Sequence, residues 1–193
     1  MCFLCRFALF SACGAIDQGI RQAVDFAYEW YLSDDQVLYL QLPEGRRPGN
    51  GEVLMRKRKL CVDLENRSHI VVRDLAVIGG SIELTGSASH NRIYEITSYY
   101  GSHTAGIVDN YQTHKQSIHI QGTGNVLEKS EIAFGAGSGI RISGEGNQVL
   151  NCLIHDFNTL GCYDAPVVMR DGQGTLLKNN TIYRAGRDGI QMF

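Results

Sequence analysis

A histidine and an arginine occupy equivalent places in two copies of one short pattern. His119 is the third residue of Ser-Ile-His-Ile-Gln-Gly (117–122), and Arg141 is the third residue of Gly-Ile-Arg-Ile-Ser-Gly (139–144). Elimination from a uronic sugar needs a base that removes the proton next to the carboxylate and a cation that neutralises that carboxylate. His119 and Arg141 are of the types that share those roles, and Tyr111 or His103 is of a type that supplies the acid. A lyase is therefore one candidate function.

Two carboxylates suggest a second reaction. Asp164 lies just before the next copy of this strand, and Asp188, which follows Arg187, lies just before the copy after that. Two carboxylates one coil apart would be about 5 Å from each other, near the separation in retaining glycosidases, whereas inverting enzymes need about 6.5–9.5 Å. An offset of one residue between the two coils leaves this separation open, and Asp188 in Gly-Arg-Asp-Gly is also typical of a turn residue that bonds its own backbone. Lyase and glycoside hydrolase both remain candidates.

The outward positions of the repeated strand are expected to form a ladder with rungs about 4.8 Å apart. Polar residues there are ordinary for any solenoid surface, but two longer segments, 98–116 and 158–165, enter the same strand and carry aromatic residues. Loops that interrupt a solenoid lie on one face, often the binding face. We therefore predict a substrate groove along the ladder, with Glu83, Tyr111, His103, Tyr163 and Gln191 as binding residues. The ladder consists of Asp63, Glu83, His119, Arg141, Val168 and Gln191.

Repeated apolar anchors predict the elements that hold this ladder. Ile118, Ile140, Val167 and Ile190 are 22, 27 and 23 residues apart, and a second series, Ile132, Ile154 and Ile182, has spacings of 22 and 28. A fixed period of this length is typical of a solenoid, whose units bury their apolar faces only by stacking. Apolar and polar residues alternate within each unit, and Gly and Asn residues lie between the strands, where turns are expected. The pattern predicts an all-β parallel β-helix with three short strands in each coil of about 22 residues.

Some polar residues of the repeat are expected to have structural roles. Asn125 and Asn147 align in successive coils and predict a stacked amide ladder inside a turn. Asp156 aligns with Arg184 one coil later and predicts an ion pair between coils. Cys152 follows the interior spacing and is expected to be a free, buried thiol.

Three stretches of the chain resemble a known superfamily. Residues 139–156 and 179–190 resemble the repeat of right-handed parallel β-helix proteins of the pectate-lyase-like superfamily, and residues 29–45 resemble the segment that precedes the helix in many bacterial members. The resemblance implies a carbohydrate-active protein that acts on an extracellular polysaccharide, located outside the cell, in the periplasm or on the cell surface. The superfamily includes lyases, hydrolases, epimerases and non-catalytic adhesins, so a binding or adhesion module is an open alternative.

The composition of the chain limits the kinds of partner and ligand that we expect. The net charge of −2 over 193 residues implies no nucleic-acid partner, and no apolar run reaches the roughly 18 residues of a membrane-spanning helix. The six cysteines do not form a disulfide framework, and Cys2-x-x-Cys5 is only half of a zinc knuckle. Asp63 and Glu83 alone are too few ligands for calcium. We therefore expect no metal and no cofactor, and the oligomeric state is left open.

The chain is expected to have two parts. Residues 1–60 form an N-terminal segment with a β-hairpin around residues 33–36, and residues 61–193 form the β-helix. The basic run 56–59 is expected on a solvated edge strand. Phe193 ends in mid-strand without a capping element, which predicts that the chain is a fragment of a longer protein. An inactive fragment is therefore a further alternative.

Overall fold

A computed structural model of the chain describes residues 3–5, 21–25, 29–50, 53–55, 58–102, 116–158, 161 and 163–193. Tyr111, His103 and most of the segment 98–116 lie outside the described residues, as do residues 159, 160 and 162 of the second segment. The chain divides into two compact units, Met1–Arg56 and Lys57–Phe193. Each unit is described by itself.

The first unit contains short antiparallel pairs. Strand β1 (Phe3–Cys5) pairs with β4 (Val53–Met55), and two short 3-10 helices are η1 (Arg21–Ala23) and η2 (Pro43–Gly45). Strands β2 (Trp30–Leu32) and β3 (Leu38–Leu40) form a hairpin, in which the Ser33 amide donates to the carbonyl of Val37. The predicted hairpin is therefore confirmed.

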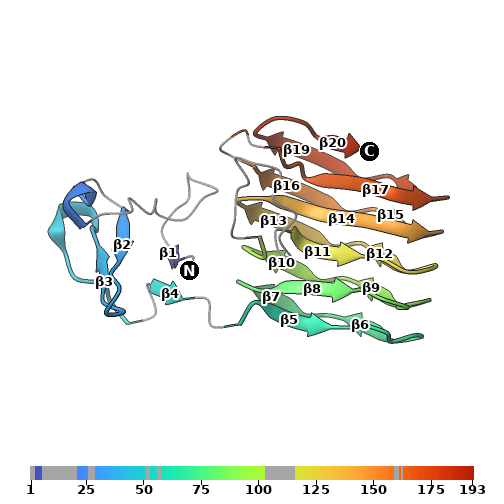
Figure 1. Cartoon of the computed structure of the whole chain (residues 1–193), viewed down its shortest axis with the longest axis horizontal. Helices are drawn as coiled ribbons and strands as arrows, with labels where there is room; N and C mark the ends of the chain where they lie inside the picture. Colours follow the sequence, from blue (N-terminus) through green and yellow to red (C-terminus); the bar gives the residue numbers. More distant parts are fainter. Residues whose placement is uncertain are drawn as a thin grey trace. The chain divides into compact units, whose positions relative to one another are not determined.

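The second unit is built from coils that each give one strand to each of three parallel sheets (Figure 1). The six-stranded sheet contains β5 (Leu60–Asp63), β8 (Ser81–Leu84), β11 (Gln116–Ile120), β14 (Ser138–Glu145), β17 (Val167–Gln173) and β20 (Ile190–Met192). One five-stranded sheet contains β6 (Val71–Arg73), β9 (Arg92–Tyr94), β12 (Val126–Glu128), β15 (Gln148–Leu150) and β18 (Leu176–Lys178). The other contains β7 (Ala76–Ile78), β10 (Thr97–Tyr99), β13 (Glu131–Gly135), β16 (Leu153–Phe157) and β19 (Thr181–Ala185). This is the parallel β-helix that the repeats predict.

The apolar anchors form two interior columns. Ile118 pairs in register with Ile82 and Ile140, and the column continues through the buried Val167 to Ile190, which lies on the last described strand and is 45% exposed. The second series, Ile132, Ile154 and Ile182, is likewise in register. Ile82, Ile118 and Ile140 are fully buried, and burying an isoleucine side chain contributes about 1.5–3 kcal/mol. Both predicted series are therefore confirmed.

A column of buried asparagines crosses the turns between the six-stranded sheet and its neighbour. The side-chain oxygen of Asn125 accepts from both the backbone and the side-chain nitrogen of Asn91, at 3.0 Å each. The side chain of Asn147 accepts in turn from the Asn125 backbone at 2.8 Å and from its side chain at 3.2 Å. Asn125 also donates to the carbonyls of Ala88 and Gln121. The predicted amide ladder is confirmed, and it extends one coil further, to Asn91.

Cys152 lies in the interior and forms no disulfide. Its sulfur donates to the Leu150 carbonyl at 3.3 Å, and burial raises the pKa of the thiol to about 11. Its backbone N–H donates to the Asn180 side chain, as the Ile96 N–H does to Ser130. The predicted free, buried thiol is confirmed.

Replacing Asn125 by alanine is expected to destabilise the second unit by about 2–4 kcal/mol. The change leaves the donors of Asn91 and the carbonyls of Ala88 and Gln121 buried without their partner, and each such group costs about 1–3 kcal/mol, partly relieved by relaxation. Chemical denaturation followed by circular dichroism measures the change. Thr123→Ala, an exposed position on the same turn, is expected to stay within about 0.5 kcal/mol of wild type. Equal losses in the two variants would contradict a structural role for the ladder.

Candidate functional site

The outward residues of the six-stranded sheet form the predicted ladder. Glu83 pairs in register with Asp63 on one side and His119 on the other. Arg141 pairs with His119 and Val168, and Val168 pairs with Gln191. The rungs are neighbouring parallel strands, whose spacing is about 4.8 Å. His119 and Arg141, 22 residues apart in the sequence, are thus next to each other on the surface.

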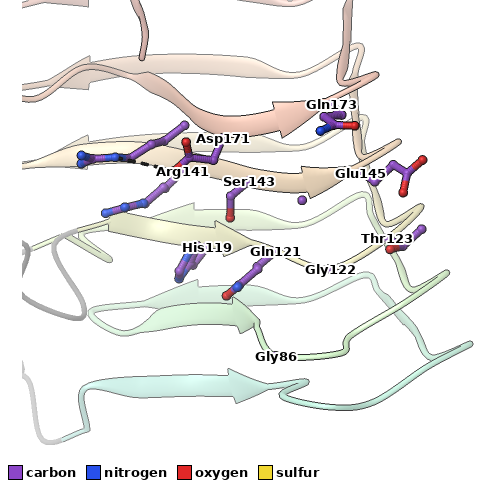
Figure 2. Close-up of a pocket in the computed structure, with 12 residues that line it drawn as sticks. Gly86, His119, Gln121, Gly122, Thr123, Arg141, Ser143, Glu145, Asp171 and Gln173 are labelled. Carbon is purple, nitrogen blue, oxygen red and sulfur yellow. Dashed lines mark ion pairs between the residues drawn. The ribbon is translucent and has the colours of Figure 1, made fainter.

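A polar hollow of about 610 Å³ lies over the central strands of this sheet. Figure 2 shows His119 and Arg141 on adjacent strands, with Gln121 and Ser143 as the next outward residues of the same two strands. Glu145 and Gln173, the last residues of β14 and β17, and Thr123, on the turn after β11, lie at another edge of the hollow. The hollow therefore has a side rich in cations and an edge with carboxylates and amides. Its lining is Gly86, His119, Gln121, Gly122, Thr123, Arg141, Ser143, Gly144, Glu145, Arg170, Asp171 and Gln173.

A β-bulge shapes one side of the hollow. Ile142 pairs with Met169 and Gly144 with Gly172, so a single residue of β14, Ser143, lies opposite two residues of β17, Arg170 and Asp171. Asp171 has φ of 53°, in the left-handed region that aspartate tolerates better than most residues. A bulge inserts an extra residue and redirects side chains. Here the extra residue is Asp171, which adds a carboxylate to the hollow beside a second arginine, Arg170.

Arg141 has donor capacity that the described residues do not use. Its Nε atom is buried and has no hydrogen-bond acceptor among the described residues. A guanidinium offers five donors in a fixed plane and suits bidentate contacts with carboxylates. His119, half-buried on the adjacent strand, supplies an imidazole ring, a group that can accept or donate a proton. Together these two groups can bind an anion and move a proton.

The carboxylates proposed from the sequence lie apart from the lining of this hollow. Asp164 is 7% exposed, and its carboxylate accepts from the Ser138 hydroxyl at 2.7 Å. Asp188 lies just before β20, where it accepts from the Gln191 side chain at 2.8 Å and lies 3.5 Å from Arg187. The separation of Asp164 and Asp188 stays a prediction.

A second group of predicted residues lies where the segments that precede β17 and β20 contact each other. The Arg187 guanidinium lies 4.5 Å from the ring centre of Tyr163, which is 66% exposed. Gln191 is buried and donates a hydrogen bond to the Asp188 carboxylate. The structure therefore divides the predicted site residues. His119 and Arg141 line the hollow, Glu83 lies on the rung beside them, and Tyr163, Arg187, Asp188 and Gln191 are associated with one another.

Sequence reasoning did not find Arg170, Asp171 or Glu145. A signal for the bulge was present, because Ile142 and Gly144 enclose one residue whereas Met169 and Gly172 enclose two. Glu145 is the last residue of β14 and follows Gly144, where the repeated sequence pattern ends. Only the structure shows that β14 continues to Glu145 and brings it to the hollow.

The third sheet carries a charged and aromatic network that spans three coils. The ring nitrogens of His155 lie 2.5 Å from Asp156 and 3.1 Å from Glu131, and the Arg184 guanidinium lies 2.5 Å from Asp156. The His155 ring stacks on Tyr183, with ring centres 4.7 Å apart. The predicted ion pair between Asp156 and Arg184 is confirmed. This network ties β13, β16 and β19 together away from the hollow.

Raising the pH from about 10 to 12 is expected to destabilise wild type more than Tyr99→Phe. Burial, supported by the hydrogen bond that Tyr99 donates to Glu131, raises the pKa of the phenol from 10.0 to about 12. The folded state thus favours the neutral phenol, whose contribution is fully present below pH 10 and is lost as the pH rises through 12. Denaturant midpoints measured across this range test the difference. Parallel curves for the two proteins would contradict it.

The described residues contain no group of three or more His, Cys, Asp or Glu side chains placed to hold a metal ion. No helix in the described part of the chain is long and apolar enough to cross a membrane.

Comparison with known proteins supports the fold. Residues 81–193, more than half of the chain, match the family described as "Right handed beta helix region". No curated protein and no solved structure matches the chain. The matched range covers the coils from β8 to β20, which include every residue of the hollow. From the family match and the stacked parallel sheets, we conclude that the chain belongs to the right-handed β-helix family.

Proposed function

We propose that this protein acts on an acidic extracellular polysaccharide, which it binds in the hollow over β11, β14 and β17 and cleaves by elimination. The observation that carries the proposal is the position of His119 and Arg141 on register-paired outward sites of one hollow. The β-helix family is compatible with carbohydrate-active and carbohydrate-binding proteins. Such a substrate also places the protein outside the cell, in the periplasm or on the cell surface.

Each group has a role in the proposed reaction. Arg141 binds the carboxylate of a uronic unit and lowers the energy of the negative charge that develops when the neighbouring carbon loses its proton. His119 takes that proton as the base. The C–O bond to the leaving sugar then breaks, a carbon–carbon double bond forms, and the leaving oxygen takes a proton from an acid. His103 and Tyr111, predicted for the acid, lie outside the described residues.

Elimination is better supported than hydrolysis. The hydrolytic pair would be Asp164 and Asp188, but the Asp164 carboxylate is buried against Ser138 and neither aspartate lines the hollow. A catalytic carboxylate must be within hydrogen-bond reach of the substrate. His119 and Arg141 are both at the surface of the hollow.

A binding or adhesion module without turnover is the second candidate. The hollow is rich in amide, hydroxyl and charged groups, which hydrogen-bond to sugars whether or not a bond is broken. Binding without product would favour this function.

Replacing His119 by alanine is expected to lower the rate of elimination about 10²–10⁴-fold with little change in substrate binding, because a general base contributes about that much. Arg141→Gln is expected to lower the rate about 10²–10³-fold and to weaken binding as well. The full chain is incubated with polygalacturonate and with alginate, and the ultraviolet absorbance of the unsaturated product is followed. Affinity is measured separately by calorimetry.

Arg67→Gln is the control, because Arg67 is exposed and does not line the hollow. It should match wild type in rate and affinity. New reducing ends without ultraviolet absorbance would show hydrolysis and overturn the elimination step. Binding that depends on Arg141 but gives no product would favour the module.

A further inference from the structure

The bulge in β17 places an aspartate, Asp171, at the same hollow as the arginine that precedes it in the sequence, Arg170. The Nε atom of Arg170 lies 3.9 Å from a carboxylate oxygen of Asp171. The Arg170 side chain is 32% exposed and the Asp171 side chain is 87% exposed. A pair at this distance and exposure is weak, because water and salt screen it. Asp171 therefore forms only a weak ion pair with the Arg170 guanidinium.

The surroundings of Arg170 favour a second anion. Arg170 follows Val168 as the next outward residue of β17, and Arg141 pairs in register with Val168. His119 is one strand further along the same lining. The opposite charge comes from Asp171 and from Glu145, the last residue of β14. An entering carboxylate thus meets two guanidinium groups on the sheet, those of Arg141 and Arg170, and one carboxylate, Asp171, that already competes for one of them.

We propose that Arg170 is a specificity residue for the acidic polysaccharide and that Asp171 is an internal competitor for its guanidinium. A carboxylate of the bound polymer displaces Asp171 from Arg170 and makes the planar two-bond contact that guanidinium groups favour. A neutral sugar unit cannot replace Asp171 in this way. The inference deepens the proposed function and depends on it, because it names the group that distinguishes acidic from neutral units in the same hollow.

A matched pair elsewhere in the chain provides a control. Arg73 and Asp74 are also adjacent, with Arg73 Nε 3.5 Å from an Asp74 oxygen, and Asp74 has φ of 55° against 53° for Asp171. Neither Arg73 nor Asp74 lines the hollow. Changing Asp74 to Asn therefore makes the same substitution beside an arginine, in the same backbone conformation as Asp171→Asn, at a position where no effect on polymer binding is expected.

The test measures binding of polygalacturonate and of its methyl ester, which masks the carboxylates on the same backbone. Asp171→Asn is expected to tighten binding of polygalacturonate about two- to fivefold, the factor that a weak surface pair represents. Arg170→Gln is expected to weaken it about tenfold. Neither change should alter the binding of the methyl ester, and Asp74→Asn should match wild type with both polymers. Asparagine tolerates the left-handed conformation, and thermal melting checks that each variant is folded.

The double variant separates competition from simple repulsion. If Asp171 acts through Arg170, the gain from Asp171→Asn disappears in the Arg170→Gln background. If the gain persists there, Asp171 merely repels the polymer and the inference is wrong. The inference alone also fails if wild type binds polygalacturonate in a manner that depends on Arg141 while Arg170→Gln has no effect. If wild type binds neither polygalacturonate nor alginate, the proposed function itself fails, and the inference with it.

Discussion

Backbone hydrogen bonding between successive coils sets the position of every side chain considered above. In a parallel sheet each strand is held about 4.8 Å from the next, with side chains alternating between the two faces. Once Ile118 pairs with Ile140, His119 must lie beside Arg141 on the opposite face. A slip of one residue would turn the isoleucines outward and the charged residues inward. The apolar interior and the polar hollow are therefore two consequences of one register.

Close contacts between turns of successive coils disfavour any other register. Gly144 has φ of 81°, and a Cβ atom there would lie 2.2 Å from the carbonyl oxygen of Gly122 on the coil below. A Cβ atom on Gly122 would likewise lie 2.0 Å from the carbonyl oxygen of Ala88. The buried asparagines act nearby, because each side chain accepts from one coil and donates to backbone carbonyls that would otherwise lie unpaired. Close approach and hydrogen bonding thus fix the same alignment.

The regular pairing of β14 with β17 is interrupted beside the hollow. The bulge at Arg170 and Asp171 interrupts one step of regular pairing and adds one charged group, Asp171, to the side that faces the hollow. Regular alternation supplies every second residue of a strand, such as His119 with Gln121 and Arg141 with Ser143. The bulge in β17 and the turn after β11 supply further groups, Asp171 and Thr123. The rigid interior makes such local departures possible without loss of the fold.

The period and the alternation of the sequence determined the coils, the two isoleucine columns, the outward ladder, the amide ladder and the pairing of Asp156 with Arg184. These follow from the chain alone because a solenoid converts a fixed separation in sequence into a fixed separation in space. The tertiary structure decided which polar residues share a hollow. It put Arg170, Asp171 and Glu145 beside His119 and Arg141, buried Asp164 against Ser138, and gathered Tyr163, Arg187 and Asp188 elsewhere. Those outcomes depend on turn length, on the bulge and on burial, which vary from coil to coil and which the repeat pattern does not encode.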